Sequence, residues 1–259
     1  MYQSLRRLSL TGAYNVRDLG GYRSLAGGSV CYGRFLRGDS LHDLTDGDVD
    51  LLLDYGVRTV IDLREPGESM QEPGRLNGDS GVVVHHVPLL AALAPALGGT
   101  LPTNLGETYL LCSRHCTTAI RAIFELLAGA DGGVLFHCVV GKDRTGIVAA
   151  LLLELAGVPR EAILADYAAS GAFLQPLVER LVRQYELDPA TGVHPDFLVC
   201  EPANMARLLD TLNHEHGGAE SYLRNLGVSE GALERLKSRI LCEQAVMRPT
   251  GTLAASPVS

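Results

Sequence analysis

Residues 136–146, Phe-His-Cys-Val-Val-Gly-Lys-Asp-Arg-Thr-Gly, constrain the fold more than any other stretch of this chain. The apolar residues 134–136 are typical of a short buried strand, and the almost wholly apolar residues 147–155 are typical of a buried helix. The loop between them carries Cys138 and, after five intervening residues, Arg144. A strand, a tight loop and a helix N-terminus in this order place a thiol beside a site for an anion.

This loop has the features of a phosphate site. The helix N-terminus adds partial positive charge, and backbone amides can point inward along the whole loop, from Val139, Val140, Gly141, Lys142, Asp143 and Arg144. The same positive surroundings favour the thiolate, which is the nucleophilic form of Cys138. The planar fork of Arg144 can hold two phosphoryl oxygens. Thr145 can donate its hydroxyl to the sulfur, and His137 can fix the loop by a hydrogen bond.

The stretch resembles the signature loop of cysteine-dependent protein tyrosine phosphatases. Its Gly-Lys-Asp-Arg-Thr-Gly form is similar to that of the bacterial atypical tyrosine/serine phosphatases of dual or triple specificity. An Asn-x-Arg-Asp-Leu-Gly-Gly element at 15–21, the Arg37 to Leu41 segment and residues 220–229 match the same family, so the resemblance reaches about Cys242. It implies a tyrosine-phosphatase-like α/β fold, in which helices flank a central, mostly parallel sheet. It also implies an added helical, lid-like insertion after the signature-loop helix.

Two aspartates are candidates for the general acid that protonates the departing oxygen. Asp62 ends the apolar stretch 57–62, which predicts a buried strand, and strands of a parallel sheet present their ends at one edge. Asp62 also matches the Asp-Leu-Arg position to which the resembled family's acid is assigned. Asp143, inside the loop, is the rival. Asp62 could instead be held in an ion pair with Arg64, and Asp143 could orient Lys142 or Arg144.

Other segments predict the supporting elements. Thr45 is a typical N-cap for a helix that stops at Gly56, residues 30–36 and 82–87 have strand character, and residues 106–128 have helical spacing. The glycine- and proline-bearing residues 91–102 are a candidate rim of the site. The 15–21 element is either a scaffold or a contact of the active-site edge. Cys112 and Cys116 lie on the apolar stripe of their helix, which favours packing over metal binding.

The length and the composition predict a single domain, and with the resemblance we expect it to be a phosphatase domain over residues 1–246. The spacing predicts amphipathic helices joined by loops over residues 158–217. They either make the lid-like elaboration that the resemblance implies or simply pack on the core. In this region the spacing predicts a short helix that ends at Ser170 and a separate amphipathic helix over 173–185. Residues 247–259, rich in Pro, Thr, Ser and Ala, are expected to be a disordered tail.

Charge and cysteine content limit the function classes. The net charge is −8, which argues against binding to nucleic acid or to an anionic membrane. No stretch approaches the length of a membrane span, so an integral membrane segment is not expected. The six cysteines form no dense framework, which is typical of a reducing compartment. The cytoplasm is therefore the expected location, although unconventional export would leave no mark in the sequence.

The sequence therefore predicts phosphate monoester hydrolysis through a phosphocysteine intermediate. Cys138 attacks phosphorus, the loop and Arg144 bind the equatorial oxygens, and Asp62 or Asp143 protonates the leaving group. We expect no metal or other cofactor, because the loop supplies the positive field. Phosphotyrosine in a protein or peptide is the expected substrate, with phosphoserine/threonine or a phosphoinositide as alternatives. A phosphate-binding module without catalysis is the other class.

Overall fold

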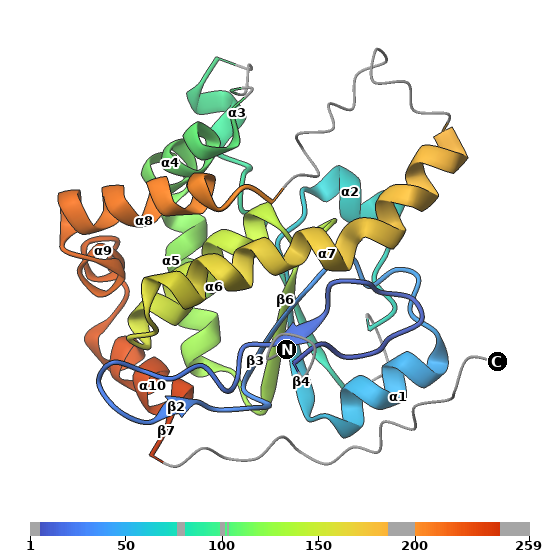
Figure 1. Ribbon diagram of the computed structural model, residues 1–259, viewed down its shortest axis with the longest axis horizontal. Coiled ribbons are helices and arrows are strands. Elements are labelled where there is room, and N and C mark those ends of the chain that lie inside the picture. Colours follow the sequence, from blue (N-terminus) through green and yellow to red (C-terminus); the bar gives the residue numbers. More distant parts are fainter. Residues whose placement is uncertain (1–5, 77–80, 99–101, 103, 186–199, 244–259) are drawn as a thin grey trace.

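A computed structural model describes residues 6–76, 81–98, 102, 104–185 and 200–243 (Figure 1). In this part of the chain, the central sheet has five strands in the order β1-β3-β6-β4-β5. Strands β3, β6, β4 and β5 run parallel to one another, and β1 pairs antiparallel with β3. The strands are β1 (Arg17–Asp18), β3 (Phe35–Gly38), β6 (Gly133–His137), β4 (Val57–Asp62) and β5 (Val83–His86). This mostly parallel sheet flanked by helices confirms the predicted fold class.

Helices flank the sheet, and they fall into three groups along the sequence (Figure 1). The first group comes before the signature loop and consists of α1 (Asp46–Asp54), α2 (Pro66–Gln71), α3 (Leu93–Ala96), α4 (Leu105–His115) and α5 (Thr117–Gly129). The second is α6 (Asp143–Leu155), which starts inside the loop, with the long α7 (Arg160–Tyr185) packed beside it. The third comprises α8 (Pro202–His216), α9 (Ala219–Asn225) and α10 (Glu230–Ile240).

Alternating side chains of the central strands enter two separate cores. Phe136 of β6 and Ile61 of β4 contribute to the larger core, which contains the buried residues of α4 to α6 and α8 to α10. Leu135 and Val60 face the other way, into a smaller core with α1 and the N-terminal segment. This is the alternation that a strand buried on both faces requires. Ten of the thirteen residues of α6 are buried, so packing fixes the position of its N-terminus.

Several predicted boundaries differ from the structure. The single predicted strand 30–36 is two strands, β2 (Ser29–Val30) and β3, and the helical stretch 106–128 breaks at Cys116. The predicted break after Ser170 is wrong, because α7 continues to Tyr185. Ser170 is buried and accepts a hydrogen bond from Arg17 (3.1 Å), a tertiary contact that no local pattern reveals. By contrast, Thr45 caps α1 as predicted.

The domain boundaries, the lid and the tail stay predictions. Within residues 158–217, α7 contacts α6 and α8, whereas residues 186–199 lie outside the described residues. The predicted disordered tail also lies outside them. Among the described residues, none of the helices combines the length and the apolar character that crossing a bilayer requires.

A disulfide joins Cys31 to Cys242, which are 211 residues apart in the sequence. It lies at the small antiparallel sheet of β2 and β7 (Leu241–Cys242), where Ser29 pairs with Cys242. Disulfides are typical of oxidising compartments. This bond therefore does not agree with the reducing environment that the scattered cysteines suggested, and the cytoplasmic location stays a prediction. Cys112 and Cys116 are free and fully buried, in accordance with a packing role.

Candidate active site

Strand β6 and helix α6 deliver Cys138 to the mouth of a tight loop. Cys138 follows the last residue of β6 directly and is 1% exposed. The loop turns at Gly141, whose φ of +67° is a left-handed conformation that favours glycine. A Cβ atom at Gly141 would also lie 2.5 Å from the carbonyl oxygen of Gly38, at the end of β3. Only glycine allows the loop to approach β3 this closely.

The carbonyl groups of the loop are held from outside by three donors. Ser40 N–H donates to the oxygen of Val139 (2.8 Å), and Asn15 Nδ2 donates to those of Val140 (2.9 Å) and Gly141 (3.1 Å). Arg37 Nη2 donates to the oxygens of Gly141 (2.7 Å) and Lys142 (3.3 Å).

These contacts fix the direction of four successive peptide groups, from 139–140 to 142–143. No cis peptide bond occurs in the described residues, and in a trans peptide the N–H points opposite to the C=O. The N–H groups of residues 140–143 therefore point away from the three donors, as a phosphate cradle requires. The 15–21 element thus contacts the loop itself through Asn15. It supports the loop and also lies at its edge, so the two interpretations from the sequence do not exclude each other.

Arg144 makes an end-on ion pair with Glu68 of α2. Its Nη1 and Nη2 atoms lie 2.5 Å and 2.8 Å from the two carboxylate oxygens. Burial alone would lower the pKa of Arg144, but the hydrogen bonds to Glu68 and the charge of an ionised Cys138 raise it above its ordinary value. Arg144 is therefore a fixed cation whose charge acts on the sulfur. Glu68 could not be predicted from the sequence, because nothing in its local pattern sets it apart from other helix-start glutamates.

Asp62 is bound tightly to Arg64. The Nε and Nη2 atoms of Arg64 lie 2.7 to 3.1 Å from the carboxylate oxygens, and its backbone N–H donates at 3.0 Å. Burial alone would raise the pKa of Asp62, but these hydrogen bonds and the nearby His137 outweigh it and lower that pKa. Asp62 does end β4 beside His137, as the parallel strands predicted. Its lone pairs, however, are directed at Arg64, which is itself completely buried.

Asp143 occupies a different environment at the start of α6. Its side chain is 27% exposed, and it accepts a hydrogen bond from the hydroxyl of Tyr109 on α4. Tyr109 in turn lies 2.8 Å from the hydroxyl of Tyr167 on α7. The ammonium group of Lys142, which is fully buried, lies 3.5 Å from Asp143. Asp143 therefore combines a fixed orientation with access to a ligand beside Arg144.

His137 and Thr145 are both buried next to the sulfur-bearing residue. Burial lowers the pKa of His137 to about 4, so the ring is neutral at pH 7, and its Nδ1 lies 3.2 Å from the carbonyl oxygen of Cys138. The hydroxyl of Thr145 donates to the carbonyl oxygen of Gly38 (3.5 Å), not to the sulfur as the sequence suggested. Both side chains therefore fix the backbone on which the loop rests.

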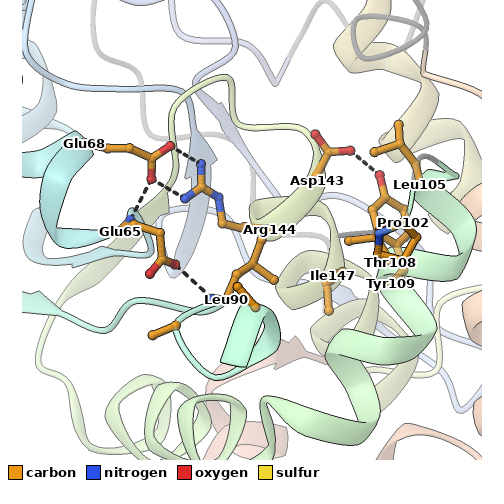
Figure 2. A pocket seen from close by; sticks show the side chains of 12 residues that line it. Glu65, Glu68, Leu90, Pro102, Leu105, Thr108, Tyr109, Asp143, Arg144 and Ile147 are labelled. Carbon is orange, nitrogen blue, oxygen red and sulfur yellow. Dashed lines mark hydrogen bonds and ion pairs between the residues drawn. The ribbon is translucent and has the colours of Figure 1, made fainter. Parts of the chain in front are cut away.

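A cavity of about 420 Å³ opens beside Asp143 and Arg144 (Figure 2). One part of its wall is apolar and consists of Leu90, Ala91, Ala94, Pro102, Leu105 and Ile147. The other part is polar and consists of Glu65, Glu68, Thr108, Tyr109, Asp143 and Arg144. The predicted rim segment 91–102 thus contributes to this wall. Among the described residues, no group of three or more His, Cys, Asp or Glu side chains is placed to hold a metal ion.

Comparison with known proteins identifies relatives over most of the chain. Residues 8–242 match the model of the tyrosine phosphatase family. A tyrosine-protein phosphatase of Nostoc commune is 36% identical over 219 residues, which cover 80% of this chain and 74% of the relative. The triple specificity protein phosphatase PtpB of Mycobacterium tuberculosis is 26% identical over 277 residues, covering 90% of this chain and 98% of the relative.

Solved structures show more distant likenesses. The crystal structure of P. aeruginosa TpbA in complex with pTyr has a TM-score of 0.35 and 22% identity, and the match covers 66% of this chain and 87% of that one. A putative phosphatase from Neisseria meningitidis has the same TM-score at 21% identity, and the match covers 58% of this chain and 92% of that one.

Proposed function

Because this chain belongs to the tyrosine phosphatase family, we propose that it hydrolyses phosphotyrosine in proteins or peptides, with Cys138 as the nucleophile. The observation that carries this proposal is the outward anchoring of the loop carbonyls described above. It directs the N–H groups of residues 140–143 away from the three donors, which supports a phosphate cradle on the side of the sulfur. A preorganised set of such donors stabilises the charge that develops on transferring oxygens, without any metal ion.

The proposed reaction has two steps. In the first, the Cys138 thiolate attacks phosphorus, the S–P bond forms as the P–O bond to the tyrosyl oxygen breaks, and Asp143 gives its proton to that oxygen. In the second, a water molecule attacks phosphorus while Asp143 accepts its proton. The S–P bond then breaks, which releases inorganic phosphate and restores the thiolate.

We assign the acid role to Asp143 rather than to Asp62, although Asp62 was the first candidate from the sequence. A general acid must be protonated and must reach the leaving oxygen. Asp62 is held ionised by Arg64, which supplies three hydrogen bonds from its side chain. Asp143 lines the cavity next to Arg144, where the leaving group would lie. Asp62 then has a structural role, the alternative that its neighbour Arg64 suggested.

Arg144 is proposed to bind the phosphoryl oxygens while Glu68 holds its plane. A guanidinium has five N–H donors, and the end-on pair with Glu68 uses one hydrogen on each of Nη1 and Nη2. The Nε–H and one further N–H remain as a parallel fork along the side of the group. This fork matches two oxygens of a phosphoryl group.

The cavity supports an aromatic substrate. Its volume of about 420 Å³ and its apolar wall suit a phenyl ring attached to the phosphate. A phosphoinositide is the second candidate, because the buried Lys142 adds a cation to the loop. The three carboxylates of the wall, Glu65, Glu68 and Asp143, would repel additional phosphate groups. A panel of phosphotyrosine, phosphoserine and phosphothreonine peptides and phosphoinositides measures this preference directly.

A chromogenic assay tests the proposal. The wild-type protein is expected to hydrolyse p-nitrophenyl phosphate, and the Cys138→Ser variant is expected to show no turnover above background. Acid quenching of the wild-type reaction, followed by peptide mass spectrometry, should detect a phosphoryl group on Cys138. Equal rates from the two proteins would exclude catalysis by Cys138. A wild-type protein that binds inorganic phosphate but does not turn over would instead indicate the non-catalytic binding module.

A further inference from the structure

A buried cluster of charges lies behind the signature loop and includes Arg37, which holds two of the loop carbonyls. Arg17 of β1, Arg37 of β3 and Asp166 of α7 are each 1% exposed. Arg17 Nε lies 3.1 Å from one carboxylate oxygen of Asp166, and Arg37 Nη1 lies 2.6 Å from the other. Burial alone would raise the pKa of Asp166, but the two arginines outweigh it and hold that pKa far below its ordinary value. Asp166 is therefore a permanent buried anion.

Uncompensated buried charge is costly, so the contacts of the two arginines decide how this cluster is held. Among the described residues Arg37 Nε has no hydrogen-bond partner, and both Nη atoms of Arg37 do. The partners of Arg37 are informative. One end of its guanidinium binds Asp166, and the other end binds the carbonyl oxygens of Gly141 (2.7 Å) and Lys142 (3.3 Å) in the signature loop. A carboxylate on α7 is thus connected through one rigid planar group to two peptide groups of the loop.

We infer that Arg37, held in place by Asp166, is a positioning residue that sets the direction of the loop N–H groups toward phosphate. This inference rests on the proposed function, because it concerns the same phosphate site. The carbonyl of Gly141 and the N–H of Lys142 belong to one trans peptide, as do the carbonyl of Lys142 and the N–H of Asp143. Holding the two carbonyls outward therefore holds these two N–H groups inward.

The geometry requires arginine in particular. Lysine has one ammonium group and cannot reach the carboxylate and both carbonyls with a fixed separation, whereas the guanidinium spans them with its planar fork. Arg37 also interacts electrostatically with an ionised Cys138, so its charge and its position both act on the nucleophile. A substitution by lysine keeps the charge and removes the fork.

The experiment compares Arg37→Lys with the matched variant Arg239→Lys. Arg239 also binds two backbone carbonyls, those of Ala130 and Gly132, but these precede β6 at the opposite end of the strand. The measurements are kcat and KM on p-nitrophenyl phosphate, the inhibition constant of inorganic phosphate, and the pH midpoint of Cys138 alkylation by iodoacetamide. Peptide mass spectrometry distinguishes Cys138 from the other thiols, and thermal unfolding compares stability.

For Arg37→Lys we expect kcat/KM to fall about 100-fold, as misplacement of a catalytic array by about 1 Å does. The phosphate inhibition constant should rise about tenfold, and the alkylation midpoint should move to higher pH. Arg239→Lys should leave kcat/KM, the inhibition constant and the alkylation midpoint unchanged, even if it lowers the melting temperature as much as Arg37→Lys does. A folded Arg37→Lys protein with a wild-type inhibition constant and midpoint would overturn the inference.

Asp166→Asn provides an independent test, because a direct effect of the Asp166 charge and a loss of the loop position would shift the alkylation midpoint in opposite directions. Loss of its negative charge alone would stabilise the thiolate and move the alkylation midpoint to lower pH. Loss of the loop position would move the midpoint to higher pH and weaken phosphate inhibition, which is the result we expect. A lower midpoint with unchanged inhibition would overturn the positioning role. Phosphate binding and alkylation need no turnover, so a wild-type protein without activity would refute the proposed function and still leave this inference testable.

Discussion

Exchanging each candidate acid for its amide should separate catalysis from stability. In Asp143→Asn the side chain keeps its size but cannot donate a proton to the leaving oxygen. General acid catalysis contributes about 10² to 10⁴ in rate, so we expect kcat on phenyl phosphate to fall about 1000-fold. The hydrogen bond from Tyr109 would then be accepted by a neutral amide oxygen, and the side chain at this position is 27% exposed, so the folded state should be destabilised by only about 1 kcal/mol.

Asp62→Asn should give the reverse pattern. Arg64 is completely buried and donates to Asp62 from Nε, Nη2 and the backbone. Removing one member of a buried ion pair costs about 3 to 5 kcal/mol. The amide retains part of the hydrogen bonding, so we expect about 3 kcal/mol. At about 2 to 4 °C per kcal/mol for a chain of this size, the melting temperature should fall by about 6 to 12 °C.

The assay uses two substrates that differ only in the leaving group. The p-nitrophenolate ion leaves without much protonation, whereas phenolate requires the acid. The ratio of the rates on p-nitrophenyl phosphate and phenyl phosphate should therefore rise sharply in Asp143→Asn and stay at the wild-type value in Asp62→Asn. If Asp62→Asn raised this ratio and Asp143→Asn did not, our reasoning about burial and the Arg64 pair would be refuted.

Three further predictions concern the surroundings of the site. The pKa of His137 is about 4 in the folded protein against an ordinary 6.5, so the unfolded chain binds the proton first as pH falls; unfolding free energy should therefore decrease by about 3 kcal/mol between pH 6.5 and 4. Urea unfolding should show this slope in the wild type but not in His137→Asn. Reduction of the Cys31–Cys242 disulfide removes a constraint on the unfolded chain and should lower the free energy of unfolding by up to about 5 kcal/mol. The double serine variant should unfold identically with and without reductant, and a wild-type protein whose stability does not change with reductant would contradict the bond. Glu68→Gln should lower kcat/KM about tenfold because the Arg144 plane is no longer held by an ion pair, whereas Glu72→Gln, beyond the end of the same helix, should match the wild type in vanadate inhibition and turnover.

Local patterns were sufficient for the elements that present the nucleophile. The apolar residues before Cys138 form β6, the apolar residues after Arg144 form α6, and Thr45 caps α1. These features depend on neighbours in the sequence, through hydrophobic periodicity and capping. Asp62 likewise ends its strand beside His137, because parallel strands share an edge.

The contacts that hold the site could not be predicted in this way. Asp166 lies 149 residues from Arg17, and Glu68 lies 76 residues from Arg144. Each of these carboxylates resembles an ordinary solvent-exposed helix residue in the sequence, and only the fold shows its burial and its partner. The choice between Asp62 and Asp143 also depended on which carboxylate an arginine occupies, a question of side-chain direction that spacing does not answer.

The Cys31–Cys242 bond also determines how this molecule responds to proteolysis. It closes a covalent ring that contains Cys138, Arg144 and both candidate acids. Cleavage of any one peptide bond inside the ring leaves the two fragments attached to each other, so a nicked molecule keeps its mass until a reductant separates them. Survival of a cut chain is thereby governed by the redox state of the surroundings as well as by the folded structure.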